Sequence, residues 1–436
     1  MHTSTDPGAM LMGDKKRVAI VGGGISGLAA AHLLEGKAHV TVFEAEPRLG
    51  GHARTVVAGK RGDQPVDTGF IVFNRQNYPL LTRLFEMLDV EVVKSNMSFG
   101  ASIDGGRLEY ALRDLGSVFA QPRNAFNPRF LRMLRDILRF NSRALALAND
   151  PHMTLGALLD RLGTGPWFRD YYILPLSGAI WSTPVAGIMD FPAQALVQFF
   201  HNHALMQASG QHQWYTVSGG SVEYVRKLQA HLVKSGVDLR LKAPVLSVWR
   251  EGRRVGLRPE GGAEEWFDEV IFACHSDQAL ALLVDPSPEE RAALGAVRYQ
   301  SNEIVLHSDT AIMPIRRNVW SSWVYTEAKG QRSDKIDLTY WMNSLQPIPK
   351  DDPLFVTLNS NRPIQPELIH DVVSFAHPVY DLAGAEGRAQ ISAMNGRRNT
   401  WYCGAWMRNG FHEDGFASAL DVVQGMDARQ RLRAAA

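Results

Sequence analysis

The chain has 436 residues, of which 45% are hydrophobic and 21% charged, and its length corresponds to roughly two or three domains. This composition excludes a disordered, collagen-like or disulfide-scaffold protein. With 46 basic and 45 acidic side chains the net charge is +1, so no chain-wide field recruits nucleic acid. The two cysteines, Cys274 and Cys403, are too few for an oxidised framework and indicate a reducing compartment.

The first residues carry no targeting pattern. Residues 1–12 (MHTSTDPGAMLM) are polar and small and match neither a secretory signal nor a transit peptide. We interpret them as an expression remnant or a disordered segment. No stretch of the sequence approaches the ~18 uninterrupted apolar residues of a membrane-spanning helix. We therefore expect a cytoplasmic protein.

A strand–turn–helix–strand pattern follows this segment. Residues 17–21 (RVAIV) predict a strand buried on both faces, and they run directly into the glycine-rich turn 22–27. A helix is expected over 28–34 and a second strand over 39–43, which ends at Glu44. This order and spacing are typical of a dinucleotide-binding βαβ unit.

Each residue type in this turn has a physical reason. Gly22 permits the tight turn, Gly24 lets a pyrophosphate touch the backbone, and Gly27 lets the helix pack close to the strand. The helix N-terminus offers unpaired N–H groups to the phosphates. Glu44 lies where a carboxylate accepts hydrogen bonds from the adenosine ribose and repels a 2′-phosphate, which argues against NADP. The residues expected to hold this half of the nucleotide are Gly22, Gly24, Ile25, Ser26, Gly27, Glu44 and Ala45.

A second glycine loop favours FAD over NAD. The loop 47–55 contains paired glycines that permit close backbone approach, and the turn 67–69 leads into an apolar strand. NAD enzymes do not ordinarily need a second loop of this kind. The residues expected to contact the cofactor here are Gly50, Gly51, His52, Arg54, Thr68, Gly69 and Phe70.

These motifs resemble those of a known superfamily. The segment Gly50-Gly51-His52-Ala53-Arg54-Thr55 is similar to the G-G-(R/K)-x-x-(S/T) ending of the N-terminal pattern in FAD-binding amine oxidases and phytoene desaturases. His52 stands where that superfamily has a basic residue, and Arg54 is the candidate to replace it. The resemblance implies an α/β fold, with a discontinuous Rossmann-like FAD-binding domain and an α+β substrate domain.

The resemblance returns further along the chain. Residues 237–248 resemble the strand pair that supplies backbone contacts to adenine, through Val245, and residues 269–274 resemble the strand that follows it. Residues 401–423 resemble the C-terminal flavin motif, with a turn at Gly404 and a last helix that contains Gly415 and Phe416.

One position of the C-terminal motif departs from the superfamily. Ala405 stands where an acidic residue is usual, so the resemblance assigns the ribityl contact to Glu413 or Asp414. Only one full dinucleotide fingerprint is present, which favours the organic substrate over NADPH as the electron source; the electron acceptor, including any partner protein, stays open. The resemblance divides the chain into an FAD-binding domain (16–75, 217–295 and 390–432) and a substrate-binding domain (76–216 and 296–389).

One segment of the expected substrate domain is rich in arginine. Residues 122–147 predict a helix with a basic face formed by Arg132, Arg135, Arg139 and Arg143 and a neighbouring apolar face formed by Leu131, Leu134, Leu138 and Leu145. A basic amphipathic helix is typical of a membrane-surface element. The alternative is a solvated arginine face whose leucines pack on the domain core. Both interpretations stay open.

Few residues are candidates for chemistry beyond the cofactor. His412 and Glu413 are expected beside the flavin ring, with Trp181 or Ser182 lining the substrate cavity. Cys403 lies near the expected flavin position, and its place on a strand favours a packed thiol over a covalent flavin link. No metal site is expected, because no cysteine or carboxylate set accompanies His201, His203 and His212.

The sequence resembles a bacterial branch of the superfamily in its G-F-H-E-D-G ending (410–415) and its compact length. That branch is associated with modification of membrane fatty acids. The resemblance implies desaturation of a methylated acyl chain of a phospholipid by hydride transfer to flavin N5, by a protein held peripherally at the inner face of the membrane. The alternatives are an amine oxidase, a redox-neutral flavin isomerase and a non-catalytic flavoprotein scaffold.

Overall fold

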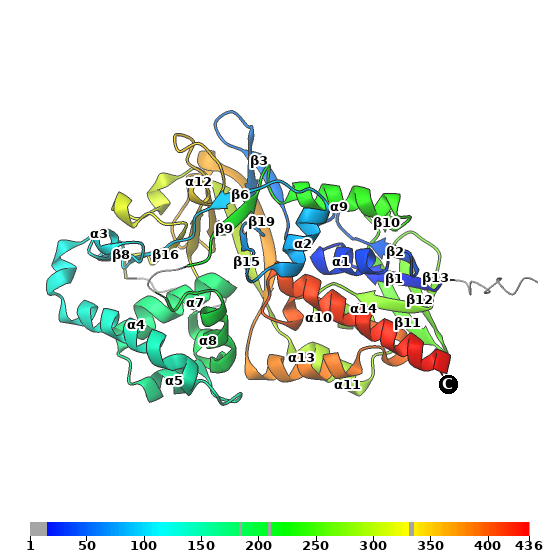
Figure 1. The fold of residues 1–436 in the computed structure, drawn as a ribbon. Helices are drawn as coiled ribbons and strands as arrows, with labels where there is room; N and C mark the ends of the chain where they lie inside the picture. The colour runs from blue at the N-terminus through cyan, green and yellow to red at the C-terminus, as the bar shows by residue number, and fades with distance from the viewer. Residues whose placement is uncertain (1–14, 183–184, 208–210, 331–334, 436) are drawn as a thin grey trace, which may run out of the picture.

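The computed structural model describes residues 15–182, 185–207, 211–330 and 335–435. The segment 1–12, interpreted as a remnant or a disordered segment, lies outside the described residues. Two regions lie end to end, one built on a parallel sheet and the other on a larger, mostly antiparallel sheet (Figure 1).

The first region is built on a five-stranded parallel sheet. Its strand order is β10-β2-β1-β14-β20, and all four pairings are parallel. Four of the strands are short runs rich in β-branched and aromatic residues that are almost wholly buried, as expected for a sheet covered on both faces, whereas the edge strand β10 is partly exposed. Their bounds are β1 Arg17–Val21, β2 His39–Phe43, β10 Asp238–Arg240, β14 Glu269–Phe272 and β20 Thr400–Tyr402.

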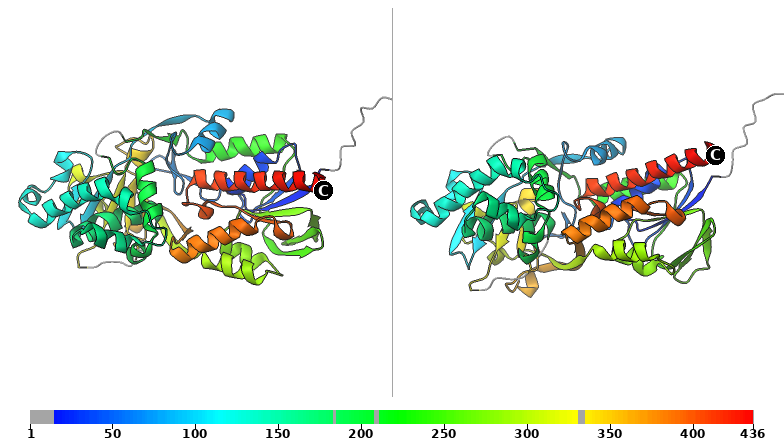
Figure 2. Two further views of the ribbon diagram at one scale, coloured as in Figure 1. Left: turned by 60° about the horizontal axis from the view of Figure 1, so that its bottom comes forward. Right: turned by 90° about the horizontal axis from the view of Figure 1, so that it is seen from below.

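Alternate residues of β1 show the two layers that cover this sheet. Val18 and Ile20 pack with helices α1 (Ile25–Leu33), α2 (Pro79–Met87), α9 (Val222–Lys234) and α14 (His412–Ala435) on one face. Ala19 and Val21 pack on the other face against β11, β12 and β13. Figure 2 shows α14 lying between α9 and α13. The elements of this second face are β11 Val245–Glu251, β12 Arg254–Pro259, β13 Glu265–Phe267, α10 Ser276–Leu282, α11 Pro288–Ala296 and α13 Leu382–Met394.

The second region is built on a seven-stranded sheet of order β19-β15-β18-β17-β16-β7-β8. Only the β16–β7 pairing is parallel among its described strands. The strands are β7 Phe99–Ile103, β8 Leu108–Ala111, β15 Tyr299–His307, β16 Trp323–Thr326, β17 Leu338–Trp341, β18 Phe355–Leu358 and β19 Ile369–Pro378. The helices beside it are α3 Leu115–Val118, α4 Pro128–Leu147, α5 Leu155–Leu162, α6 Pro166–Phe168, α7 Leu174–Trp181, α8 Ala193–Asn202 and α12 Met342–Leu345.

Smaller elements join the two regions. A two-stranded sheet pairs β3 with β4, and a three-stranded sheet has the order β5-β9-β6. Their bounds are β3 Thr55–Ala58, β4 Gln64–Asp67, β5 Phe73–Asn74, β6 Val92–Ser95 and β9 Trp214–Val217. The short helices are η1 Pro122–Phe126, η2 Arg169–Ile173, η3 Val185–Asp190, η4 Thr310–Ile312, η5 Arg317–Val319, η6 Pro366–Leu368, η7 Arg397–Asn399 and η8 Ala405–Met407.

The α/β fold class with a Rossmann-like sheet is confirmed. The five parallel strands come from residues 16–75, 217–295 and 390–432, and the seven strands of the large sheet come from 76–216 and 296–389. Helices α11 and α13 run across the expected limits at 295 and 390.

Helix α4 differs from one of its two sequence interpretations. The side chains that it buries are Phe130, Met133, Asp136, Phe140 and Ala144, and these pack on the core of the second region. Leu131, Leu138 and Leu145 are instead 43%, 64% and 43% exposed. The interpretation that the leucines pack on the domain core is therefore wrong for these three, because the face that packs on the core carries Phe130, Met133 and Phe140 instead.

Candidate functional site

Two glycine loops meet at the N-terminus of α1. Gly50 N donates a hydrogen bond to Gly23 O at 2.8 Å, and Gly24 lies beside Gly51. Gly24 is the N-cap of α1, and no described side chain hydrogen-bonds the first turn as a cap. The first backbone N–H groups of α1 are therefore available to an anion, which the helix dipole also favours.

Two glycines of this turn, Gly22 and Gly27, cannot carry a side chain without a shift of the backbone. A Cβ on Gly27 would lie 1.9 Å from Gly22 O, and Gly22 itself has a φ of +110°. Gly24 differs from both, because a Cβ there would meet only Gly51 Cα, at 4.0 Å. Gly22 and Gly27 thus serve the fold of the turn, whereas Gly24 leaves open space over the helix end.

Glu44 is held in place by the backbone around it. Its Oε2 accepts from Gly23 N at 2.6 Å and its Oε1 from Glu46 N at 2.9 Å. The Glu44 carbonyl accepts from Ala243 N at 2.9 Å, which brings the segment leading to Val245 beside the end of β2. Ala45 is exposed, and Val245 is buried at the start of β11. The residues expected at the ribose and adenine end are therefore neighbours.

The N-terminal end of α14 packs against that of α1. A Cβ on Gly415 would lie 2.8 Å from Ile25 Cγ2 and 2.9 Å from Ser26 Oγ, so the absence of a side chain permits this approach. Gly404 N donates to Ser418 Oγ at 2.9 Å, and Phe416 is buried beneath. The positive ends of two helix dipoles therefore converge near the glycine loops. These backbone donors, together with the Glu44 carboxylate, fit a dinucleotide with two phosphates.

The loop after the paired glycines is fastened to the turn that contains Gly69. Phe70 N donates to His52 O at 2.9 Å, and Thr68 N donates to Arg54 O at 2.9 Å. A Cβ on Gly69 would lie 2.0 Å from His52 O, so this pairing requires glycine.

Arg54, the candidate to replace the missing basic residue, pairs with a carboxylate of the second region. Its guanidinium donates two hydrogen bonds to Asp371 of β19, at 2.6 and 3.0 Å, which ties the loop to the second region. Arg48 instead braces the paired glycines, by donating to Gly51 O at 2.9 Å and to Ala53 O at 3.3 Å. Sequence reasoning did not single out Arg48, although its place two residues before Gly50 was a usable signal.

Three histidines gather where the two regions meet. The His52 ring lies 5.4 Å from His377, 6.1 Å from His275 and 4.6 Å from Phe375, between ring centroids. Burial, and then the neighbouring His275, lower the pKa of His52 to about 4, and burial lowers the pKa of His377 to about 3. Asn302 Nδ2 lies 2.9 Å from His377 Nδ1. All three are therefore neutral hydrogen-bonding groups at pH 7, and sequence reasoning missed His275 and His377 because they are remote in the chain.

His412 lies in the same part of the molecule. It is buried, its ring stacks on Phe70 with 3.8 Å between centroids, and its Nε2 lies 3.0 Å from the Tyr224 hydroxyl. Burial lowers the pKa of His412 to about 3. The imidazole is therefore neutral at pH 7 and can exchange hydrogen bonds, but it does not store a proton.

The carboxylates beside His412 have other partners than those expected. Glu413 accepts from Leu80 N at 2.9 Å and Leu81 N at 3.0 Å, because the N-cap of α2, Tyr78, supplies no side-chain oxygen to that turn. Asp414 accepts from Phe411 N at 3.0 Å and so caps its own helix. Both carboxylates therefore cap helix N-termini, and the ribityl contact expected of Glu413 or Asp414 stays a prediction.

Trp181 joins the two regions through an aromatic cluster. Its ring lies 4.7 Å from Phe191 and 4.9 Å from Phe199, and its Nε1 donates to Asn409 O at 3.2 Å. The Ser182 carbonyl accepts from Asn302 Nδ2 at 3.2 Å. Trp181 and Ser182 therefore line the junction from the side of the second region.

A groove of about 490 Å³ opens beside this cluster, between α2, α8 and α14. Phe199 and Phe411 stack in its wall at 4.8 Å, and His203 stacks on Phe199 at 3.8 Å. Burial lowers the pKa of His203 to about 4, so this aromatic part of the wall is neutral, whereas Arg408, Glu413, Asp414 and Asp421 line other parts of the groove.

Two further expectations concern Cys403 and a histidine group. Cys403 directly follows β20 and is fully buried, and burial raises the pKa of its thiol well above the ordinary value, as expected for a packed core thiol. His201, His203 and His212 do not converge on a metal: His203 Nδ1 lies 2.9 Å from Phe199 O, and His212 Nε2 lies 3.0 Å from Asn202 O.

Comparison with known sequences gives one family match over most of the chain. The profile of a family described as flavin containing amine oxidoreductase matches residues 25–337. The carotenoid phi-ring synthase of Streptomyces griseus is 29% identical over 310 residues, which cover 64% of this chain and 56% of that protein. Protoporphyrinogen oxidase 2 of Arabidopsis thaliana is 58% identical over 43 residues, 10% of this chain and 8% of that protein. The chain thus spans little more than half the length of one relative and a small part of the other.

Solved structures share the fold over almost the whole chain. The CLA-producing fatty acid isomerase from P. acnes has a TM-score of 0.67 at 14% identity and covers 95% of this chain and 99% of that one. The cyclohexylamine oxidase from Brevibacterium oxydans IH-35A has a TM-score of 0.62 at 14% identity and covers 95% and 100%. At these identities the likeness concerns the fold alone.

Proposed function

The chain belongs to the flavin containing amine oxidoreductase family, and from that premise we propose that it dehydrogenates a lipid acyl chain at a membrane surface. FAD is its cofactor, and it is an FAD-dependent oxidoreductase. The proposed substrate is a methylated fatty acid of a phospholipid, and the proposed location is the inner face of the cytoplasmic membrane.

The residues of this chain have distinct parts in such a reaction. The N–H groups at the start of α1 hold the pyrophosphate, and Glu44 holds the adenosine ribose. When bound, FAD would supply the acceptor for the hydride that leaves the acyl carbon, and a base or water would take the proton from the neighbouring carbon as the double bond forms. An unactivated C–H bond is a very weak acid, so placement of the chain must supply most of the rate. Phe199 and Phe411 in the groove wall, with Trp181 packed behind Phe199, supply apolar surface for that placement.

The exposed face of α4 is the observation that carries the proposal. Leu131, Leu138 and Leu145 recur every seven residues and therefore form one stripe along the helix. Arg132 and Arg135 beside the stripe are also exposed, and Phe126 just before the helix is 88% exposed. Figure 1 places α4 at the end of the molecule opposite the C-terminus. Apolar side chains flanked by arginines complement an anionic bilayer surface.

The names of two matched proteins support a hydrophobic substrate. One is a carotenoid synthase and the other a fatty acid isomerase. The described residues contain no helix that is both long and apolar enough to cross a membrane.

The proposed attachment is by the exposed surface of α4.

The substrate is tested by anaerobic mixing of the FAD-loaded protein with vesicles that contain a methylated-acyl phospholipid. We expect the oxidised flavin absorbance to bleach, and to bleach much less with the matched unmethylated lipid. Bleaching by cyclohexylamine or putrescine, with none by either lipid, would establish the amine oxidase alternative instead. Conversion of lipid double bonds without net flavin reduction would establish the isomerase alternative, which the fatty acid isomerase fold favours.

The membrane surface is tested by flotation with vesicles of anionic and of zwitterionic phospholipid. Burial of a leucine side chain is favourable by about 1.5–3 kcal/mol when complete, so the triple variant Leu131/Leu138/Leu145→Ser is expected to lose at least about tenfold in partition. The control Leu246→Ser removes a 53% exposed leucine from β11 in the other region and is expected to float like the wild type. Equal flotation of all three proteins would refute the assignment to α4.

A further inference from the structure

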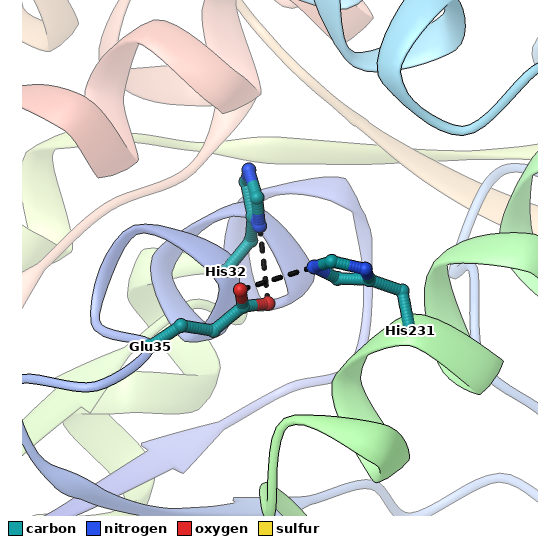
Figure 3. A group of neighbouring side chains, drawn as sticks. All are labelled: His32, Glu35 and His231. Carbon is teal, nitrogen blue, oxygen red and sulfur yellow. Dashed lines mark hydrogen bonds and ion pairs between the residues drawn. The ribbon is translucent and has the colours of Figure 1, made fainter.

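A group of potential metal ligands lies between α1 and α9 (Figure 3). His32 is in the last turn of α1, Glu35 is two residues beyond the end of that helix, and His231 is in the last turn of α9. Figure 3 shows both imidazoles directed at the one carboxylate. His32 Nδ1 lies 3.1 Å from Glu35 Oε1, and His231 Nε2 lies 3.0 Å from Glu35 Oε2.

The three ligand atoms are close to the spacing that an ion needs. One atom from each residue lies within 4.8 Å of the other two. In a tetrahedral zinc site with bonds of about 2.0–2.1 Å, ligand atoms lie about 3.3–3.4 Å apart. A shift of at most about 1.5 Å between side-chain tips therefore converts this group into a coordination sphere. Without an ion, the same carboxylate accepts hydrogen bonds from both rings, which keeps the ligands together.

Two packed helices hold the ligands in this arrangement. The His32 and His231 rings meet edge to face with 5.4 Å between centroids. The side chains of His32, Glu35 and His231 are 21%, 20% and 34% exposed, so solvent reaches the group while most of each side chain is shielded. This leaves room for a water molecule as a fourth ligand.

We propose that His32, Glu35 and His231 form a zinc-binding site that links α1 to α9. Two imidazoles and one carboxylate suit a borderline transition-metal ion, whereas magnesium and calcium prefer oxygen ligands. His32 follows the first residue of α1 by seven positions, which is about 10 Å along a helix. The ion therefore lies away from the phosphate cradle, and its role is to fasten the helix that carries the cradle. This inference does not depend on the lipid substrate.

The test uses the FAD-loaded protein after removal of metals with a chelator. Zinc is titrated in competition with a chromogenic chelator, and thermal unfolding is followed with and without zinc. We expect one zinc ion per chain and a higher midpoint of unfolding, with no such shift from magnesium. His32→Gln and His231→Gln are each expected to weaken binding at least about tenfold, since loss of a mere outer partner of a metal ligand already costs about 10–100-fold.

The control is His152→Gln, which removes an exposed histidine from the other region and is expected to bind zinc like the wild type. Circular dichroism and flavin absorbance report whether each variant is folded. Wild-type protein without a saturable one-to-one phase would overturn the proposal even if both ligand variants failed to fold. Binding that is unchanged in folded His32→Gln and His231→Gln would overturn it equally.

Discussion

The substitution Gly24→Ala separates cofactor binding from folding. A methyl group there meets only Gly51 Cα, at 4.0 Å, and the backbone at φ −74° and ψ −177° accepts alanine. Alanine is a poorer N-cap than glycine, which destabilises the fold by up to about 1 kcal/mol. Alanine also lowers the entropy of the unfolded chain, which stabilises the fold by about 0.4–1 kcal/mol. The free energy of unfolding of the apoprotein should therefore change by less than about 1 kcal/mol.

The same methyl group stands over the backbone donors that the pyrophosphate needs. Loss of two hydrogen bonds to a charged group costs about 1.5–3 kcal/mol each. The affinity for FAD is thus expected to fall by about 10²- to 10⁴-fold. In contrast, a Cβ on Gly27 would lie 1.9 Å from Gly22 O, so Gly27→Ala should destabilise the apoprotein itself.

The assay compares thermal unfolding of the two apoproteins with titration of each by FAD, followed by flavin fluorescence. Gly295→Ala is the matched control, because that glycine is exposed within α11 and its nearest neighbour is Leu280 Cδ2 at 3.9 Å. A Gly24→Ala protein that binds FAD within about threefold of the wild type would refute the placement of the phosphates at α1.

Three other predictions concern buried charges and the flavin link. Arg250, with a side chain 2% exposed, donates to both oxygens of Glu290 at 2.8 and 2.9 Å; Arg250→Met should cost about 3–5 kcal/mol in urea unfolding, against about 0–1 kcal/mol for the exposed Arg61→Met. Burial raises the pKa of Asp414 from 3.8 to about 6, so the folded state keeps a proton over that window and this carboxyl destabilises the fold as the pH rises through it. Asp414→Asn keeps a capping oxygen but does not titrate. Its free energy of unfolding, relative to that of the wild type, should therefore rise by up to about 3 kcal/mol between pH 4 and pH 7. A difference between the two proteins that is the same at both pH values contradicts this. Burial raises the pKa of the Cys403 thiol and so disfavours the reactive thiolate, and we expect acid precipitation to release all of the flavin; a yellow pellet would show a covalent link.

The phosphate-binding and ribose-binding residues of the cofactor site were predictable from the sequence. The turn 22–27 and Glu44 lie within one βαβ unit, where spacing alone brings a glycine backbone, a helix end and a carboxylate to one place. The contact of Gly415 with Ile25 was not predictable from spacing, since nearly four hundred residues separate them; only the resemblance assigned both residues to one cofactor site. Within the motif, the partners of Glu413 and Arg54 were not predictable, because α2 and Asp371 come from distant segments.

The sequence by itself therefore determined the parallel sheet and the phosphate-binding turn, because short-range patterns of burial and backbone freedom produce both. The tertiary structure alone decided which residues meet across the junction. The neutral histidines 52, 275 and 377 converge only when β19 packs beside the glycine loop. The tertiary structure also decided that Leu131, Leu138 and Leu145 are exposed. Sequence periodicity shows which residues share a face of a helix, but packing determines which face is buried. Likewise, His231 lies beside His32 and Glu35 only because α9 packs against α1.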